Sequence, residues 1–267
     1  GHPAAPPADV SADQKKRGRG DAHGPEEMDV SVDDAAKKAK AGGITEEVVA
    51  KMVERASKLS KSRKKRPLPE GLASVDDVKS FASLGKYPLH TTSGATRGIA
   101  CVDVDPASSK VVTGGVDGKF KVFDTGVNKA ASPAIKAHAK KVTSVKFLGS
   151  EKAGAEDWAL DLVGTCSVDK TCKIWRRNEE GGTARLAYAY DLAHTLDGHS
   201  DDVVAMALQA TRDYVATFGK DGAWILYDLL DGAKLAGAQS DGGFCCGDFH
   251  PDGLLMATGG GDARGRV

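Results

Sequence analysis

The sequence predicts an all-β fold built from repeated propeller blades, preceded by a disordered tail and a short helical linker. In the second half of the chain, an apolar run, a tight turn and a second apolar run recur four times. The four turns carry Asp117, Asp169, Asp221 and Asp262. Six residues after each of the first three turns stands an aromatic residue: Phe123, Trp175 and Tyr227. The turns are 52, 52 and 41 residues apart, and a period of about 40–45 residues is typical of a four-stranded propeller blade.

The first part of the chain has a different composition. Residues 1–43 carry almost no large apolar side chains, so they cannot bury enough surface to offset their ordering entropy, and we expect them to be disordered. Residues 44–97 are expected to form a helix and then a basic, proline-containing linker. The helix is predicted over 45–62, with Thr45 as its N-cap. Its apolar stripe at helical spacing consists of Val48, Val49, Met52, Ala56 and Leu59.

Residues 98–267 are expected to hold the blades, and these do not complete a ring. The predicted blades are 98–124, 134–177, 194–228 and 233–267. They amount to about 3.5 of an expected seven blades. A closed ring is expected because each blade buries its faces only against its neighbours, and only closure removes the open sheet edges. We therefore expect the chain to lack its C-terminal part and its N-terminal start.

Charge and cysteine content narrow the class of protein. Thirty-seven basic residues balance 37 acidic ones, so the chain has no net charge that would attract nucleic acid or a membrane surface. Apolar stretches are far shorter than the about 18 residues of a membrane span. There are five cysteines without C-x-x-C spacing. Three of them lie in apolar strand-like runs, so we expect buried, reduced thiols and an intracellular compartment.

A basic cluster follows the predicted helix. It consists of Arg63, Lys64, Lys65 and Arg66, beside Pro67. Such a cluster is typical of a nuclear-localisation signal, and it also arises by chance in unrelated sequences. Both interpretations stay open at this point.

The residues with titratable groups fall into the repeat. In WD-repeat blades a histidine, a hydroxyl residue, the turn aspartate and the strand tryptophan form a buried hydrogen-bonded chain. The second blade supplies all four, as His138, Ser167, Asp169 and Trp175. The third keeps His199 and Asp221 but has Gly219 and Tyr227 in the other places, and the first keeps Asp117 with Gly115 and Phe123. We therefore expect one intact network and eroded copies beside it.

A catalytic interpretation of the same residues is possible. His138, Ser167 and Asp169 are the residue types of a hydrolase triad, but they follow the repeat, and no G-x-S-x-G elbow is present. His194 and His199 have no carboxylate or cysteine at ligand spacing. We predict a structural network, with no catalytic, cofactor-binding or metal-binding residue.

Longer motifs resemble one particular family. The run from Gly43 to His90, with its RKKR-x-L-P-x-x-LAS element, resembles the segment before the propeller in the pre-mRNA-processing factor 19 family. TGGVDGKFKVFD, KKVTSVKFLGS, SVDKTCKIWR and FHPDGLLMATG resemble that family's first four blades. The resemblance covers roughly residues 43–267.

The resemblance implies a nuclear function. Members of the family are E3 ubiquitin ligases of the U-box type and scaffolds of the spliceosome, with a further role in DNA repair. A U-box binds the ubiquitin-conjugating enzyme, a coiled coil makes a homotetramer, and the propeller binds partners and substrates. This sequence has neither a U-box nor the coiled coil, so no catalytic residue is carried over. We expect protein partners through the propeller, and neither a membrane nor a direct nucleic-acid site.

Two alternatives remain beside this interpretation. One is an unrelated WD-repeat adaptor without ligase activity, and the other is an enzyme with a propeller active site. A U-box followed by apolar heptads upstream of this sequence would favour the ubiquitin-ligase scaffold over the adaptor. A propeller enzyme needs titratable groups that converge on the central channel, and the repeats supply none.

Overall fold

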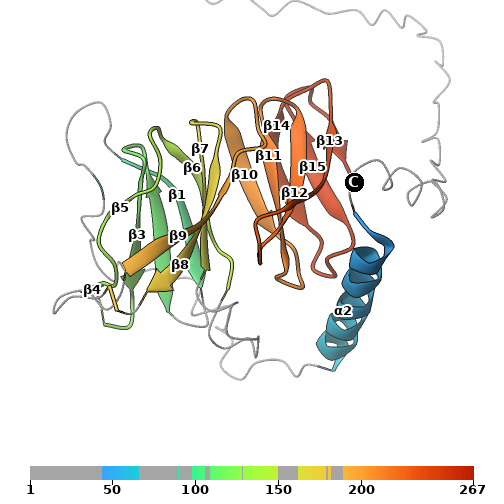
Figure 1. Cartoon of the computed structure of the whole chain (residues 1–267), viewed down its shortest axis with the longest axis horizontal. Coiled ribbons are helices and arrows are strands. Elements are labelled where there is room, and N and C mark those ends of the chain that lie inside the picture. The colour runs from blue at the N-terminus through green and yellow to red at the C-terminus, as the bar shows by residue number, and fades with distance from the viewer. Residues whose placement is uncertain are drawn as a thin grey trace, which may run out of the picture.

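Four antiparallel sheets stand side by side in the computed structural model, arranged as the blades of a propeller (Figure 1). The structure describes residues 44–65, 90, 98–105, 109–127, 129–149, 162–178, 180, 181 and 189–267. The predicted disordered tail, the insertion at 149–160 (Gly149 apart) and most of the linker lie outside these residues. The predicted all-β propeller fold is confirmed.

The sheets follow one another in chain order. The first contains β1 (Ile99–Asp105), β2 (Lys110–Gly115), β3 (Lys119–Asp124) and β4 (Lys129–Ala130), and β5 (Ile135–Lys136) also pairs with β3. The second contains β6 (Val142–Phe147), β7 (Leu162–Ser167), β8 (Cys172–Asn178) and β9 (Ala189–Leu196). The third contains β10 (Val203–Leu208), β11 (Tyr214–Gly219), β12 (Ala223–Asp228) and β13 (Lys234–Gln239). The fourth contains β14 (Phe244–Phe249), β15 (Met256–Gly260) and β16 (Gly265–Arg266).

Each blade repeats the same backbone irregularity. The inner strand shifts its register against the second strand after its first residue, between Ile99 and Cys101, Val142 and Ser144, Val203 and Ala205, and Phe244 and Cys246. A bulge of this kind increases the local twist and re-aims the neighbouring side chains. Its recurrence shows that the four blades are copies of one unit although their side chains differ.

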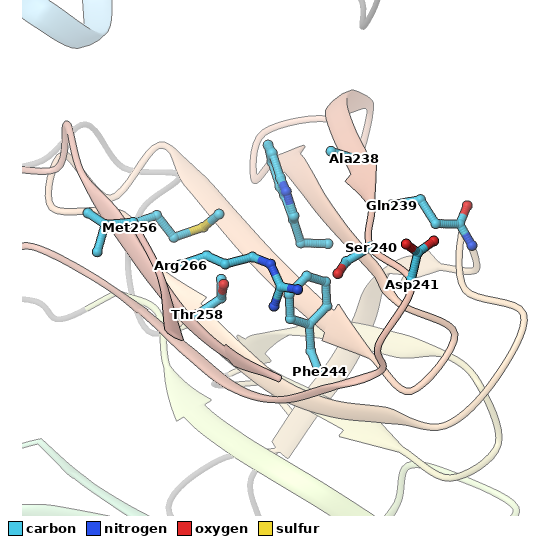
Figure 2. A pocket seen from close by; sticks show the side chains of 10 residues that line it. Ala238, Gln239, Ser240, Asp241, Phe244, Met256, Thr258 and Arg266 are labelled. Atoms are coloured by element: carbon cyan, nitrogen blue, oxygen red, sulfur yellow. The ribbon is translucent and has the colours of Figure 1, made fainter. Parts of the chain in front are cut away.

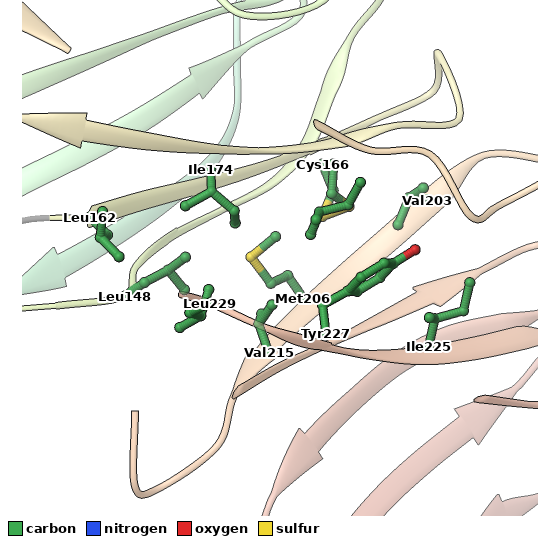
Figure 3. Close-up of a cluster of buried hydrophobic side chains, with 12 residues drawn as sticks. Leu148, Leu162, Cys166, Ile174, Val203, Met206, Val215, Ile225, Tyr227 and Leu229 are labelled. Atoms are coloured by element: carbon green, nitrogen blue, oxygen red, sulfur yellow. A yellow bond between two sulfur atoms is a disulfide. The ribbon is translucent and has the colours of Figure 1, made fainter. Parts of the chain in front are cut away.

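The largest apolar cluster lies between the second and third blades (Figure 3). Strands β7 and β11 are buried at every position because a blade covers each of their faces. The cluster consists of Leu148, Leu162, Cys166, Cys172, Ile174, Leu196, Val203, Met206, Val215, Ile225, Tyr227 and Leu229. Gly164 faces the sulfur of Met206, and a Cβ there would collide with it. The two blades therefore approach closely at Gly164, and a side chain there would require Met206 to move.

The cysteines differ from the sequence prediction. Cys166 and Cys172 were expected as reduced thiols, but they form a disulfide between β7 and β8. Strand register explains the pairing: the two are direct cross-strand partners, and their Cα atoms lie 4.2 Å apart. Both are fully buried, which shields the bond from thiol reductants in solution. The other three cysteines are free; Cys101 is half-buried, and Cys245 and Cys246 are exposed.

The two ends of the blade row differ in how they are covered. At the first blade, Val102 and Val104 of β1 are more than half exposed, at 60% and 56%. At the other end, helix α2 (Glu46–Lys64) lies beside the last sheets (Figure 1). The predicted helix and its Thr45 cap are confirmed, since the Thr45 hydroxyl accepts from the Val48 N–H at 3.3 Å.

Helix α2 packs on the third and fourth blades through part of its predicted stripe. Val48 and Met52 contact the cluster that contains Tyr214, Phe218 and Phe244, and Ala56 is 1% exposed. Val49 instead faces solvent, at 43% exposed. No helix among the described residues is long and apolar enough to cross a membrane.

Two polar contacts fix the helix on the blades. The Arg55 guanidinium forms an ion pair with Asp213, whose side chain is only 7% exposed. Further along the helix, the Arg63 guanidinium donates to the Pro251 carbonyl. The ion pair, the hydrogen bond to Pro251 and the apolar contacts together make α2 part of the folded unit.

We predict that Arg55→Ala loosens the helix. Losing the guanidinium leaves the Asp213 carboxylate without its charged partner, and the amides of α2 should exchange with deuterium about tenfold faster. Lys51→Ala, at an exposed position of the same helix, should leave the exchange unchanged. Equal exchange rates in the two variants would contradict a docked helix.

Candidate functional site

The turn between the second and third strands has the same chemistry in all four blades. A carboxylate oxygen of each turn aspartate accepts the backbone N–H two residues later, at 3.0–3.2 Å. The four aspartates are Asp117, Asp169, Asp221 and Asp262. An aspartate in this geometry closes a local turn and leaves its second oxygen and remaining lone pairs for another partner.

In the second blade that partner is a buried histidine. The Nδ1 of His138 lies 3.0 Å from a carboxylate oxygen of Asp169. Its Nε2 lies 2.9 Å from the Thr165 hydroxyl, and the same hydroxyl accepts from Nε1–H of Trp175 at 3.0 Å. Since a carboxylate only accepts, Nδ1 carries the proton, and Nε2 accepts from the threonine. The chain therefore runs in one direction, from tryptophan to threonine to histidine to aspartate.

The hydroxyl in this chain belongs to Thr165 and not to Ser167, where the sequence analysis placed it. The Ser167 hydroxyl donates to the Lys141 carbonyl at 2.8 Å and accepts from the Asp169 N–H at 3.0 Å. Ser167 is the last residue of β7, so its side chain is positioned to close the turn. Thr165 is two residues deeper in the strand, on the same face, and there it lies between the rings of His138 and Trp175.

The network extends to two further blades. In the first, His90 Nδ1 lies 3.2 Å from Asp117, and its Nε2 lies 3.1 Å from the Thr113 hydroxyl. In the third, His199 Nδ1 lies 3.1 Å from Asp221, and its Nε2 lies 2.8 Å from the Thr217 hydroxyl. The sequence analysis assigned no histidine to the first blade and no hydroxyl to the first or third. A threonine four residues before each turn aspartate was the signal that would have found the hydroxyls.

The aromatic position completes the chain only in the second blade. Phe123 has no N–H to donate, and the hydroxyl of Tyr227 lies against Gly198, where a Cβ would collide with it. The full network of four side chains therefore occurs once among the described blades. The histidine, threonine and aspartate occur three times.

Burial sets the protonation of the network. Desolvation lowers the pKa of His138 and outweighs the opposing effect of Asp169. For Asp169, burial favours the neutral form, but hydrogen bonds from Thr171 and Ala139, together with the interaction with His138, outweigh it and lower the pKa. The same balance, with N–H donors from Ser200 and Ala223, lowers the pKa of Asp221. At neutral pH the second blade thus holds a neutral imidazole against a carboxylate.

The fourth blade departs from the pattern. Thr258 and Asp262 occupy the repeat positions, but Ser240 stands where the histidine would be. The Ser240 N–H donates to the Gly222 carbonyl, just as the His138 N–H donates to the Gly118 carbonyl. The Arg266 guanidinium pairs with Asp262 instead. A hollow of about 450 Å³ opens beside these residues (Figure 2), with Trp224, Phe244 and Met256 in its wall. The guanidinium of Arg266, which lies in this wall, is already paired with Asp262. We therefore assign no ligand to the hollow.

The network geometry is that of a structural element. The triad interpretation requires the Ser167 hydroxyl beside His138, but His138 Nε2 bonds to Thr165, whose side chain is fully buried. Within the described part of the chain, no group of three or more His, Cys, Asp or Glu could hold a metal ion. In the first three blades, the network fastens the loop before the inner strand to the turn of the same blade.

The predicted basic cluster lies at the end of α2. Arg63 and Lys64 are in its last turn, and Lys65 is its C-cap. All three are exposed, and Arg66 lies outside the described residues. Lys64 and Lys65 are therefore open to solvent, while Arg63 is also bonded to the fourth blade.

Comparison with known proteins agrees with this repeat. The model of the WD domain, G-beta repeat, matches residues 86–124, 132–176 and 190–228. The first of these ranges includes His90, and each range contains one histidine–threonine–aspartate set. The chain is thus a WD-repeat propeller protein.

Three relatives carry pre-mRNA-processing factor 19 in their printed names. Pre-mRNA-processing factor 19 homolog 2 of Arabidopsis thaliana is 36% identical over 220 residues, which cover 81% of this chain and 38% of the relative. Pre-mRNA-processing factor 19 of Oryza sativa is 34% identical over 220 residues, with the same coverage. That of Mus musculus is 29% identical over 232 residues, which cover 84% of this chain and 42% of the relative. Over about four fifths of its length the chain is therefore a relative of the pre-mRNA-processing factor 19 proteins, which confirms the resemblance. It spans about two fifths of their length.

We predict that Thr165→Val destabilises the fold more than loss of an exposed hydroxyl does. The change keeps the shape but leaves the His138 imidazole and the Trp175 N–H without their buried partner, and should lower the free energy of unfolding by about 2–4 kcal/mol. Thr125→Val removes one hydrogen bond at an exposed turn and should cost less than about 1 kcal/mol. Urea unfolding measures both, and equal losses would contradict a relay through Thr165.

We also predict an acid-sensitive stability that depends on His138. Burial lowers its pKa in the folded state, so below the unfolded pKa of about 6.5 the unfolded chain takes up a proton that the folded chain refuses. The free energy of unfolding should then fall by up to about 1.4 kcal/mol per pH unit until the folded pKa is reached. In His138→Gln this part of the slope disappears, although the variant is less stable at neutral pH. An identical slope in both proteins would contradict a neutral, buried His138.

Proposed function

We propose that the chain is the partner-binding and substrate-binding propeller part of a nuclear scaffold for pre-mRNA splicing. The observation that carries this proposal is the 36% identity to a pre-mRNA-processing factor 19 homologue over 81% of the chain. The described residues support a binding role, because the buried networks hold surface loops in place and the threonine hydroxyls beside their histidines are buried away from solvent.

Ubiquitin ligation enters the proposal only as what the family resemblance of the sequence implies. We infer that an intact protein of this family acts as an E3 ubiquitin ligase, with a role in DNA repair as well, through a U-box that recruits the ubiquitin-conjugating enzyme. The segment given by this sequence would present substrates and would not transfer ubiquitin itself. Assembly into a homotetramer would belong to the coiled coil of the intact protein.

Nuclear localisation belongs to the same proposal. Import would use the basic cluster Arg63–Arg66, of which Lys64 and Lys65 are exposed beside the docked helix. The alternative is a WD-repeat adaptor that has no part in splicing or ligation. WD repeats alone favour neither, since many unrelated scaffolds carry them.

A competition experiment separates these two functions. We predict that an excess of the chain, added to nuclear extract, slows splicing of a reporter pre-mRNA, because its blades occupy partners needed by the endogenous factor. An unrelated WD-repeat propeller at the same concentration serves as the control and should not slow the reaction. Affinity-tagged chain recovered from the extract should carry spliceosomal RNAs. Normal splicing, with no such RNA on the tagged chain, would favour the adaptor and contradict the proposal.

A further inference from the structure

The turns of the first two blades form one continuous surface with the segment that joins them. The N–H groups of Ala137 and His138 donate to the Gly118 carbonyl at 3.0 and 2.9 Å. Three residues further on, the Lys141 carbonyl accepts from the Val168 N–H at 3.2 Å. The segment 136–141 is therefore fastened to the first turn at one end and to the second turn at the other.

Five lysines lie on this surface, which we name the lysine face: Lys119, Lys136, Lys140, Lys141 and Lys170. All except the half-buried Lys119 are exposed. The Lys136 ammonium donates to the Asp117 carbonyl at 2.8 Å, which places it beside the first turn. Lys170 stands in the second turn with φ 75°, in the left-handed region.

The carboxylates of these turns point into the blades and not toward the surface. The side chains of Asp117 and Asp169 are only 7% and 15% exposed, because they point inward to His90 and His138. The network thus withdraws the negative charges into the blades and leaves the ammonium groups outside. A cluster of like charges held this way attracts an oppositely charged partner and steers its approach.

The third blade carries the opposite charge at equivalent positions. Two and three residues after His138 come Lys140 and Lys141, and at the same distances after His199 come Asp201 and Asp202. The equivalence is structural, since the Asp202 carbonyl accepts from the Lys220 N–H at 2.9 Å, as the Lys141 carbonyl does from Val168. Asp202 is also paired with the Lys220 ammonium. The positive surface therefore ends at the border of the second and third blades.

We propose that the lysine face binds an acidic polypeptide segment, a run of Asp and Glu residues on a partner protein. A single-stranded nucleic acid fits less well for two reasons. The large apolar side chains exposed on the described residues are Val, Ile and Leu, so the aromatic platforms on which bases stack are missing there. The phosphate backbone of a nucleic acid that extended past the second blade would also be repelled by the carboxylates of Asp201 and Asp202. This inference does not depend on a role in splicing.

The direct test is binding of a fluorescent decaglutamate peptide to the whole chain, followed by anisotropy at about 0.05 M and about 0.2 M salt. Lys140→Glu/Lys141→Glu should weaken binding about tenfold or more, and the wild-type affinity should fall as salt rises. The matched control is Lys129→Glu/Lys234→Glu, which reverses two exposed lysines on β4 and β13. It should change the affinity less than about twofold. Equal losses in both double variants would overturn the proposal.

Three further measurements locate the peptide, exclude nucleic acid and control for misfolding. Carbodiimide joins a carboxylate to a lysine amine in contact with it, so the peptide should cross-link to Lys136, Lys140, Lys141 or Lys170. Cross-links confined to the basic clusters at 15–19 and 37–40 would overturn the proposal. A decauridylate that binds more tightly than decaglutamate and responds to the same variants would overturn it in favour of RNA. Lys170→Glu, a single change at an exposed turn, should weaken the peptide in the same direction and checks that the double variant has not acted through misfolding.

Discussion

The rest of the structure depends on the hydrogen bond between a buried histidine and the aspartate of a surface turn. In each of the first three blades it joins two segments far apart in the sequence, such as His138 and Asp169. The aspartate fixes the tautomer of the imidazole, the threonine hydroxyl donates to the other ring nitrogen, and the strand tryptophan adds a further donor in the second blade. Unpaired, each of these buried groups would cost about 1–3 kcal/mol. The network therefore favours a state in which the loop and the turn are folded together.

This constraint links the core to the surface. By holding Asp117 and Asp169 inward, the network determines which charges the turns present to a partner. The same backbone framework carries lysines after His138 and aspartates after His199. Two blades with equal architecture thus offer opposite electrostatics, and binding specificity can change by exposed side chains alone while the fold is preserved. Helix α2 adds a further element on the side of the third and fourth blades.

Much of the architecture could be predicted from the sequence, because the residues that form the turns recur in each blade. The turn aspartates, the aromatic offset and the helix with its Thr45 cap follow from local rules, and the structure contains them. The network hydroxyl could not be fixed in this way. Residues 165 and 167 lie on the same face of β7, so alternation does not separate them, and only depth in the strand does. His90 was missed because it stands nine residues before β1, whereas His138 and His199 stand four before their strands. The disulfide left a weak signal, since Cys166 and Cys172 are equally distant from Asp169 and hairpin residues equidistant from a turn become partners.

Nitrogen-detected NMR of the imidazole rings tests the histidine network most directly. The account predicts that His90, His138 and His199 each carry their proton on Nδ1, with a slowly exchanging signal, while Nε2 shows the shift of a hydrogen-bond acceptor. For His138 this neutral form should persist as the pH falls below the ordinary histidine pKa, because burial lowers its pKa. Protons on Nε2, or a ring at His138 that charges at the ordinary histidine pKa, would contradict the account.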